Sequence, residues 1–222
     1  MEFDPLSLDP ADRYKLLIGC IVPRPIALVS TISIDGKHNL APFSFFAGVG
    51  SDPMSLLFCP ANRTDGGEKD SLVNAKPVAE GGTGEFVVNV ASEPIATRVA
   101  AAAEPLPHGE SEFDLVGLTP TPSRVVRPPR VLESPACFEC RTTQVVRLNP
   151  GVRAGGNIVI GRVVHVHVRD DAINERLHLD ADKLAAFGRM GGAWYATTRQ
   201  RFEMPMGKAA LALDPRRLLP KG

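Results

Sequence analysis

The chain has 222 residues, a hydrophobic fraction of 44% and a formal net charge of +0. This length fits one large β-rich domain or two small ones, and the apolar content suffices for a packed core, which excludes a disordered chain. Zero net charge argues against a nucleic-acid-binding protein, because such proteins carry a basic excess that neutralises phosphates. No apolar run reaches the about 20 residues that span a bilayer, and the N-terminus lacks a signal-peptide pattern, so we expect a cytoplasmic protein.

Short β-branched segments between prolines and glycines dominate the sequence, which has 20 residues of each of these two types. Such regular spacing predicts an antiparallel barrel or sandwich. Asp35-Gly36 predicts a tight hairpin turn, because glycine accepts the positive φ that this turn needs. The predicted strands are Ile26–Ile34, Asn39–Phe46, Met54–Cys59, Glu85–Val90, Ala136–Leu148 and Asn157–Val168.

Helical patterns are few and short. We predict helices over Ser71–Lys76, where Pro77 ends the pattern, over the alanine-rich Pro94–Glu104, and over Asp182–Phe187. The proline-rich segment 120–135 reads as a loop or an edge. The sequence shows neither an internal repeat nor a composition break, so we expect residues 1–222 to form a single domain.

Polar side chains interrupt the hairpin made by the first two predicted strands. Alternation puts Ser30 on one face of the first strand and Thr31 on the other. In a regular second strand Asn39 and Ser44 also point apart, but Pro42 favours a bulge or an edge position. A bulge would turn both side chains to one side and free backbone groups for a flat polar ligand. The alternative is that these residues are ordinary strand residues bonded to their neighbours.

Three segments of this hairpin region together resemble the flavin reductase-like family of FMN-binding split barrels. They are Arg24-Pro-Ile-Ala-Leu-Val-Ser-Thr31, Asn39-Leu-Ala-Pro-Phe-Ser-Phe-Phe46 and Ser51-Asp-Pro53. Further matches follow in the same order: Lys69-Asp-Ser71, Thr83-Gly-Glu-Phe-Val-Val-Asn89, Gly161-Arg-Val-Val-His-Val-His167, Arg189-Met-Gly-Gly192 with Tyr195, and Phe202-Glu-Met-Pro205. The resemblance covers roughly residues 12–206 and points to the group that contains flavoredoxin and nitrilotriacetate monooxygenase component B.

This resemblance implies a mainly β fold, a six-stranded Greek-key split β-barrel with a few short helices. It also implies a homodimer with FMN near the subunit interface. The residues that it places at the flavin are Ser30, Thr31, Asn39, Ala41, Pro42, Phe43 and Ser44.

Lys69-Asp70-Ser71 precedes a predicted helix, and the amide groups at a helix N-terminus suit a phosphate. We assign Asp70 or Ser71 to capping the helix, and Lys69 with the Ser71 hydroxyl to the FMN phosphate, a role that the resemblance favours. The alternative is a plain capped surface helix. The glycine-rich segment 62–68 departs from the family pattern, which leaves the role of Arg63 open.

Two further motifs are candidates for other chemistry. His165 and His167 share one face of a predicted strand and could hold a metal, but the sequence shows no third ligand, so we predict no metal site. An alternative role for one of them is to help place a nicotinamide or protonate a reduced flavin. Cys137 and Cys140 have redox spacing but lie in a strand pattern, which favours structural thiols.

Two later segments extend the expected site. The segment Asn149–Asn157 is flexible by composition and is either an idle loop or a lid over the flavin, with Arg153 toward a cofactor phosphate. Arg189-Met-Gly-Gly192 allows close backbone approach. The resemblance places Arg189 and Tyr195 near the flavin pocket, and we expect Trp194 to be a packing residue.

The function that the resemblance implies is hydride transfer from NADH or NADPH to FMN, with reduced flavin supplied to a monooxygenase partner. We expect no catalytic acid or base, because the cofactor carries this chemistry. The first alternative is a flavoredoxin-type electron carrier without nicotinamide turnover. A tetrapyrrole-binding split barrel and a nucleic-acid-binding β-barrel are further alternatives.

Overall fold

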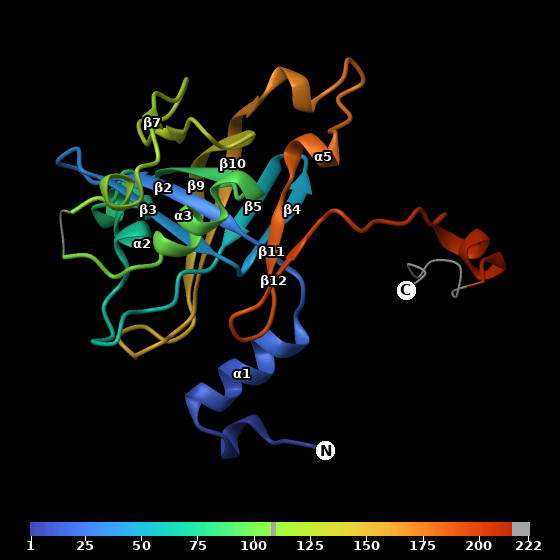
Figure 1. The fold of residues 1–222 in the computed structure, drawn as a ribbon. Coiled ribbons are helices and arrows are strands. Elements are labelled where there is room, and N and C mark those ends of the chain that lie inside the picture. Colours follow the sequence, from blue (N-terminus) through green and yellow to red (C-terminus); the bar gives the residue numbers. More distant parts are fainter. Residues whose placement is uncertain (108–109, 215–222) are drawn as a thin grey trace.

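The computed structural model describes residues 1–107 and 110–214, and the fold is mainly β (Figure 1). The α-helices are α1 (Pro10–Cys20), α2 (Asp70–Ala75), α3 (Ala96–Ala101), α4 (Glu112–Val116) and α5 (Ala181–Leu184). The strands are β1 (Arg24–Pro25), β2 (Ala27–Ile32), β3 (His38–Phe43), β4 (Phe46–Ser51), β5 (Met54–Phe58), β6 (Glu85–Val90), β7 (Pro120–Thr121), β8 (Arg130–Val131), β9 (Ala136–Arg147), β10 (Asn157–Val168), β11 (Phe187–Arg189) and β12 (Tyr195–Thr197). Short 3₁₀ segments cover Pro5–Ser7, Val78–Glu80, Glu93–Ile95, Asp170–Ala172 and Gly207–Ala212.

The principal sheet has seven antiparallel strands in the order β3-β2-β6-β9-β10-β5-β4. The sheet curls so that β3, at one edge, comes close to β5, next to the other edge. The ring centroids of Phe43 in β3 and Phe58 in β5 are 5.1 Å apart. The edges β3 and β4 are joined through Ser44 and Phe45 but do not pair, which leaves the barrel split. The split-barrel class is confirmed, with one strand more in the principal sheet than the predicted six.

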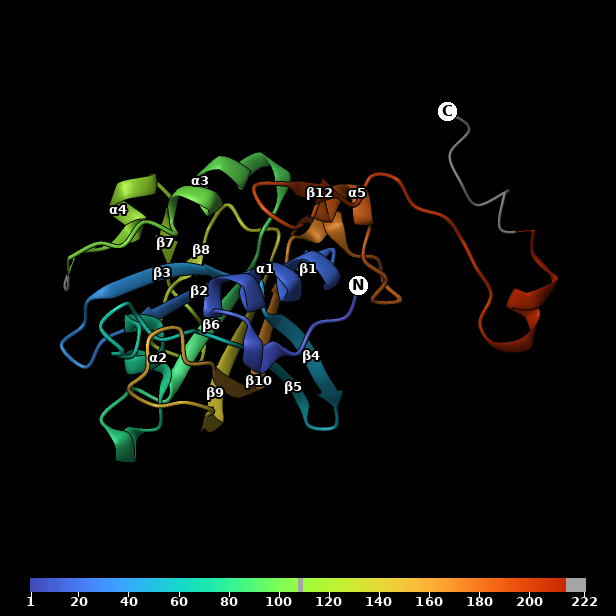
Figure 2. The same cartoon turned by 90° about the horizontal axis from the view of Figure 1, so that it is seen from below.

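Strand β2 separates two apolar cores. Ala27 and Val29 face the barrel interior, where they share a buried cluster with Phe58, Phe86 and Leu72 of α2. On the opposite face, Ile26 and Leu28 pack with residues of α3 and α4 in a second buried cluster. Figure 2 shows α3 and α4 on one side of β2 and β3, and α2 on the other. The alternation predicted from the sequence therefore holds along this strand.

The hairpin of β2 and β3 is regular, so of the two predicted alternatives for Pro42, a bulge or an edge position, the structure has the edge position. Each residue from His38 to Phe43 has one partner in β2, with no register shift, and the turn uses Gly36 at φ 89°. The reason is the edge position of β3. Pro42 has no N–H group, and an edge strand bonds only one neighbour, so its nitrogen faces away from β2 at no cost to the ladder.

The other predictions of local structure hold to different degrees. All six predicted strands form, and the first two predicted helices correspond to α2 and to the Glu93–Ile95 turn followed by α3. The third is wrong beyond Leu184, because Ala185 adopts a left-handed conformation at φ 44° and Phe187 begins β11. Helix α1 was not predicted, although Asp9 accepts the Asp12 N–H at 2.8 Å and Pro10 occupies the first turn.

Residues 202–214 leave the body of the molecule (Figures 1 and 2). The segment through Gly207–Ala212 runs outward, as the red trace in Figures 1 and 2 shows. Phe202, Met206 and Leu211 on it are exposed. Within the described ranges, none of the helices combines the length and the apolar character that a bilayer crossing requires.

Gly161 of β10 provides a test of the packing inside the barrel. A Cβ atom there would lie 2.4 Å from Cζ of Phe86, whose ring is fully buried against Phe58. We expect Gly161→Ala to lower the free energy of unfolding by about 1–3 kcal/mol through overpacking. Urea unfolding followed by circular dichroism measures this. Gly48→Ala is the matched control, because nothing lies within 4 Å of its Cβ position, and equal losses in both variants would contradict this account.

Candidate functional site

A buried cluster of hydroxyl and amide groups joins β2, β3 and α2. The Asn39 amide donates to Thr31 Oγ1 and to Ser71 Oγ, both at 3.1 Å, and the Asn74 amide donates to Thr31 Oγ1 at 3.0 Å. All four residues are buried. The structure thus brings together three of the predicted site residues, Thr31, Asn39 and Ser71, and adds Asn74.

Lys69 lies at the solvent end of this cluster. Its Nζ is 5.9 Å from the ring centroid of Phe43, a predicted site residue on the same face of β3 as Asn39 and Ala41. Lys69 is exposed and is itself the N-cap of α2, with no side-chain capping bond. The predicted capping by Asp70 or Ser71 is therefore wrong, since the helix starts at Asp70 and the Ser71 hydroxyl accepts from Asn39 instead.

The outer edge of β3 carries the backbone groups that do not bond β2. The Leu40 N–H donates to Glu112 Oε2 of α4 at 2.8 Å, so Leu40 and Pro42, which share a parity, turn their backbone groups away from β2. In the described part of the chain no strand pairs with this edge. The role of Glu112 was not predicted, because it lies 72 residues from Leu40 in the sequence and no local pattern indicates their contact.

Glu112 is a buried carboxyl group on that edge. Burial raises the pKa of Glu112, the negative charge of Asp70 raises it further, and the hydrogen bond from the Leu40 N–H opposes the shift. The group therefore holds its proton more tightly than an exposed glutamate does.

Arg24 organises the other end of β3. This side chain is 2% exposed, and its Nε donates to Ser44 Oγ at 3.2 Å. The remaining bonds go to the carbonyl oxygens of Ile18 and Ile21 at 2.7 and 2.8 Å and of Met190 at 3.1 Å. No carboxylate pairs with Arg24 in residues 1–107 and 110–214. The C-terminal carbonyls of α1 supply partial negative charge instead.

Arg189 and Tyr195 lie next to this arrangement. Arg24 pairs with Arg189 across β1 and β11, and Arg189 pairs with Tyr195 across β11 and β12. The Arg189 guanidinium stacks on the Tyr195 ring at 4.5 Å from its centroid and donates to the Gly192 carbonyl at 2.7 Å. The predicted residues Ser44, Arg189 and Tyr195 thus form a second group, and β3 spans the roughly 17 Å between it and Asn39.

Ser30 is separated from both groups. It faces the opposite side of β2, is fully buried, donates to the Pro129 carbonyl, and accepts from the Asn89 amide at 3.1 Å. Asn89 also accepts from the Val131 N–H at 2.8 Å. The Ser30 hydroxyl therefore joins β2 to the segment around residue 130 and does not point toward Thr31 and Asn39.

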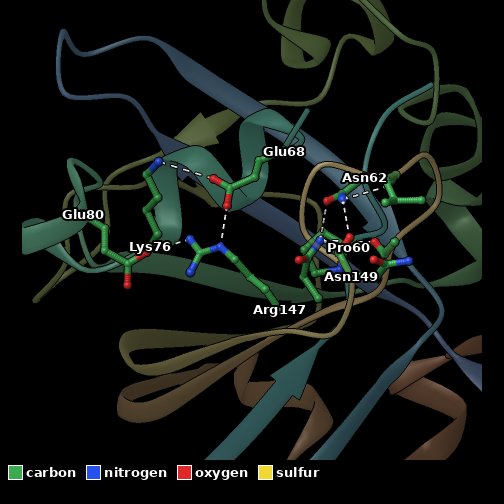
Figure 3. A network of polar contacts seen from close by, with 10 residues as sticks. Pro60, Asn62, Glu68, Lys76, Glu80, Arg147 and Asn149 are labelled. Carbon is green, nitrogen blue, oxygen red and sulfur yellow. Dashed lines mark hydrogen bonds and ion pairs between the residues drawn. The ribbon is translucent and has the colours of Figure 1, made fainter. Parts of the chain in front are cut away.

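The loop between β9 and β10 is fastened to neighbouring segments, although its composition predicts flexibility (Figure 3). Arg147 donates to Glu68 and to Glu80, both at 2.6 Å, and Lys76 donates to Glu68 at 3.3 Å (Figure 3).

Two asparagine side chains bond the same loop. The Asn62 amide donates to the carbonyls of Asn149 and Val152. The Asn157 amide donates to the carbonyls of Pro60 and Gly155 and to Asn62 Oδ1. These bonds hold the loop against residues 60–68, and Arg153 on it is exposed.

Cys137 and Cys140 lie on opposite faces of β9, as predicted. Both are buried and free. Burial raises the pKa of Cys137 to about 11 and raises the pKa of Cys140 further still. These thiols therefore stay protonated at neutral pH and suit packing better than redox exchange.

Comparison with known proteins identifies the family of the chain. The sequence model of the flavin reductase like domain matches residues 18–188. The structure is similar to nitrilotriacetate monooxygenase component B from Bacillus cereus, with TM-score 0.84, 32% identity, and coverage of 92% of this chain and 98% of that one. It is also similar to the 2-nitrobenzoate 2-nitroreductase NbaA of Pseudomonas fluorescens, with TM-score 0.81, 28% identity, and coverage of 94% and 97%.

A third structure shares the fold at lower identity. It is described as a flavin reductase with a split barrel domain from Shewanella frigidimarina, with TM-score 0.77, 21% identity, and coverage of 93% of this chain and 100% of that one. The fold and the family model define a split-barrel protein with a flavin reductase-like domain. The chain belongs to the flavin reductase-like family.

Thr31 tests the amide cluster. Thr31→Val removes the oxygen that accepts from Asn39 and Asn74 but keeps the side-chain shape. We expect the free energy of unfolding to fall by about 1–3 kcal/mol, because a buried amide loses its acceptor. Urea unfolding measures the change. Thr197→Val, at an exposed strand position, should leave stability nearly unchanged, and similar behaviour of the two variants would argue against the cluster.

Glu112 gives a prediction on pH. Because the pKa is raised in the folded state, the native protein binds this proton more tightly than the unfolded chain does. The contribution of Glu112 to the free energy of unfolding is therefore lost as the pH rises from the carboxyl pKa of the unfolded chain through the higher pKa of the folded protein. Glu112→Gln removes the ionisation, so we expect the variant to gain stability relative to wild type over that rise.

Urea unfolding at a series of pH values from about 4 to 7 measures this difference. Asp114→Asn, at an exposed position of α4, is the control and should keep the pH dependence of the wild type. A constant difference between Glu112→Gln and wild type across the series would contradict the raised pKa.

Proposed function

We propose that the protein binds FMN along the outer edge of β3 and acts as an NAD(P)H:flavin oxidoreductase. The observation that carries the proposal is the unpaired edge of β3 at Ala41 and Pro42, which is partly exposed and lies between a cationic end at Lys69 and a hydroxyl end at Ser44. Bound flavin would supply the hydride chemistry, accepting from a reduced nicotinamide.

The residues at this edge fit the parts of FMN. Backbone groups next to Pro42 and the Ser44 hydroxyl suit the polar rim of the ring system. Phe43 and Ala41 provide apolar surface between the two ends. Lys69 supplies a positive charge for the phosphate, and Ser71 supplies a hydroxyl that already lies 3.1 Å from Asn39. The proposed cofactor residues are thus Thr31, Asn39, Ala41, Pro42, Phe43, Ser44, Lys69 and Ser71, with Arg189 and Tyr195 at the Ser44 end.

Ser30 is not in the proposed set, because its hydroxyl donates to the Pro129 carbonyl and accepts from the Asn89 amide on the opposite face of β2. Arg24 enters as a positioning residue, because its guanidinium fixes the Ser44 side chain and the Met190 carbonyl at the same time. The protein's task in this reaction is to orient two planar rings and exclude water. Such a task needs no catalytic acid or base.

The homologous structures support the oxidoreductase assignment. One is component B of a monooxygenase and another is a nitroreductase, and each spans nearly the whole chain. We propose on this basis that the reduced flavin serves an oxygenase partner. We also propose a homodimer, in which exposed side chains such as Tyr195 and Trp194 lie near the partner subunit.

Absorption spectroscopy under anaerobic conditions tests the activity. The purified protein reconstituted with FMN should show a flavin band that bleaches when NADH or NADPH is added. A flavoredoxin-type carrier would keep its band with both nicotinamides and lose it with dithionite. A protein that takes up no flavin would contradict the proposal entirely.

The phosphate assignment is tested by comparing two ligands. We expect Lys69→Ala to weaken FMN binding about tenfold through loss of one charged contact, and to leave riboflavin binding unchanged. Fluorescence quenching of each flavin by the protein measures both affinities. Lys37→Ala, exposed in the β2–β3 turn, is the matched control. Equal weakening of both flavins in Lys69→Ala would place the phosphate elsewhere.

A further inference from the structure

Glu139, His165 and His167 meet on the outer face of β9 and β10, away from the proposed flavin edge. One ligand atom from each lies within 4.8 Å of those of the other two. His165 is the cross-strand partner of Glu139, and a register shift between Val163 and His165 turns both histidines to the side of Glu139. The sequence contains the His-x-His pair, and the fold brings the third side chain to it.

The carboxylate of Glu139 is fixed in place by the backbone. It is fully buried and accepts the N–H groups of Arg124 at 2.7 Å, Val125 at 2.7 Å and Val126 at 3.2 Å. Its Oε1 also lies 2.6 Å from Nε2 of His167. The group is thus a preorganised anion beside two imidazoles.

The two imidazoles are placed as a pair. Their ring centroids are 4.5 Å apart, and both side chains are partly exposed. His165 makes no hydrogen bond to any of the described residues, so its nitrogens are available to an added ligand. Solvent can reach the side of the cluster that faces away from the sheet.

We propose that Glu139, His165 and His167 form a binding site for a divalent transition-metal ion of the zinc type. Two imidazoles and one carboxylate are the donor set of open zinc and non-haem iron sites, with water in the remaining positions. The ion would take the place of the proton between His167 and Glu139, and the backbone bonds to Glu139 would stay as its outer support. This site is independent of the flavin assignment.

Metal titration of the full-length protein tests the proposal. After treatment with a chelator and desalting, the protein is titrated with Co²⁺, and Zn²⁺ is then added as a competitor. We expect one Co²⁺ per chain with visible d–d absorption that Zn²⁺ removes. His165→Ala and His167→Ala should each weaken binding at least about tenfold, because each removes one of three protein ligands.

His178→Ala is the matched control, because this histidine is exposed and outside the cluster, and its binding should equal that of wild type. Both cluster variants spare the Glu139 contacts to the backbone, and circular dichroism checks that they are folded. Absence of a Co²⁺ spectrum in the wild type would overturn the proposal. Binding that survives in both folded cluster variants would overturn it as well, since the ion would then lie elsewhere.

Discussion

The one-sided pairing of β3 is the constraint on which the proposed site depends. An edge strand presents backbone groups that the sheet does not satisfy, and most proteins protect such edges. Two features leave no unpaired N–H group at Leu40 and Pro42 on this edge. Glu112 accepts the Leu40 N–H, and Pro42 has no N–H group. The edge is thereby protected from pairing with another strand, while Ala41 and Pro42 stay partly exposed on it.

The buried positive charge of Arg24 fixes the Ser44 end of the same edge. Arg24 is enclosed without a carboxylate partner in the described residues, and carbonyl groups from α1 and from Met190 compensate it. A buried charge is costly unless its donors are satisfied, so these segments are tied to one arrangement. Through Ser44 the same guanidinium fixes the bend between β3 and β4, where the barrel is split.

The two proposed sites lie at different places on one sheet and differ in their chemistry. The proposed flavin edge lies at β3 and depends on backbone groups, one lysine and hydroxyl side chains. The proposed metal cluster lies at β9 and β10 and depends on a buried carboxylate whose lone pairs are directed by the segment 124–126.

The sequence by itself determined six of the seven strands of the principal sheet, the hairpin turn at Gly36 and the two-faced character of β2, because alternation and glycine conformation are local properties. It also pointed to Thr31, Asn39, Phe43, Ser44, Lys69 and Ser71, through a resemblance carried by ordered motifs. Only the tertiary structure decided that Pro42 needs no bulge and that Ser30 bonds the Pro129 carbonyl. It also decided that Glu112 accepts the Leu40 N–H, that Arg24 donates to Ser44, and that Glu139 lies beside His165 and His167. The physical reason is that pairing partners and burial join residues distant in sequence: Glu112 meets a backbone group 72 positions away, and Arg24 one that is 166 positions away.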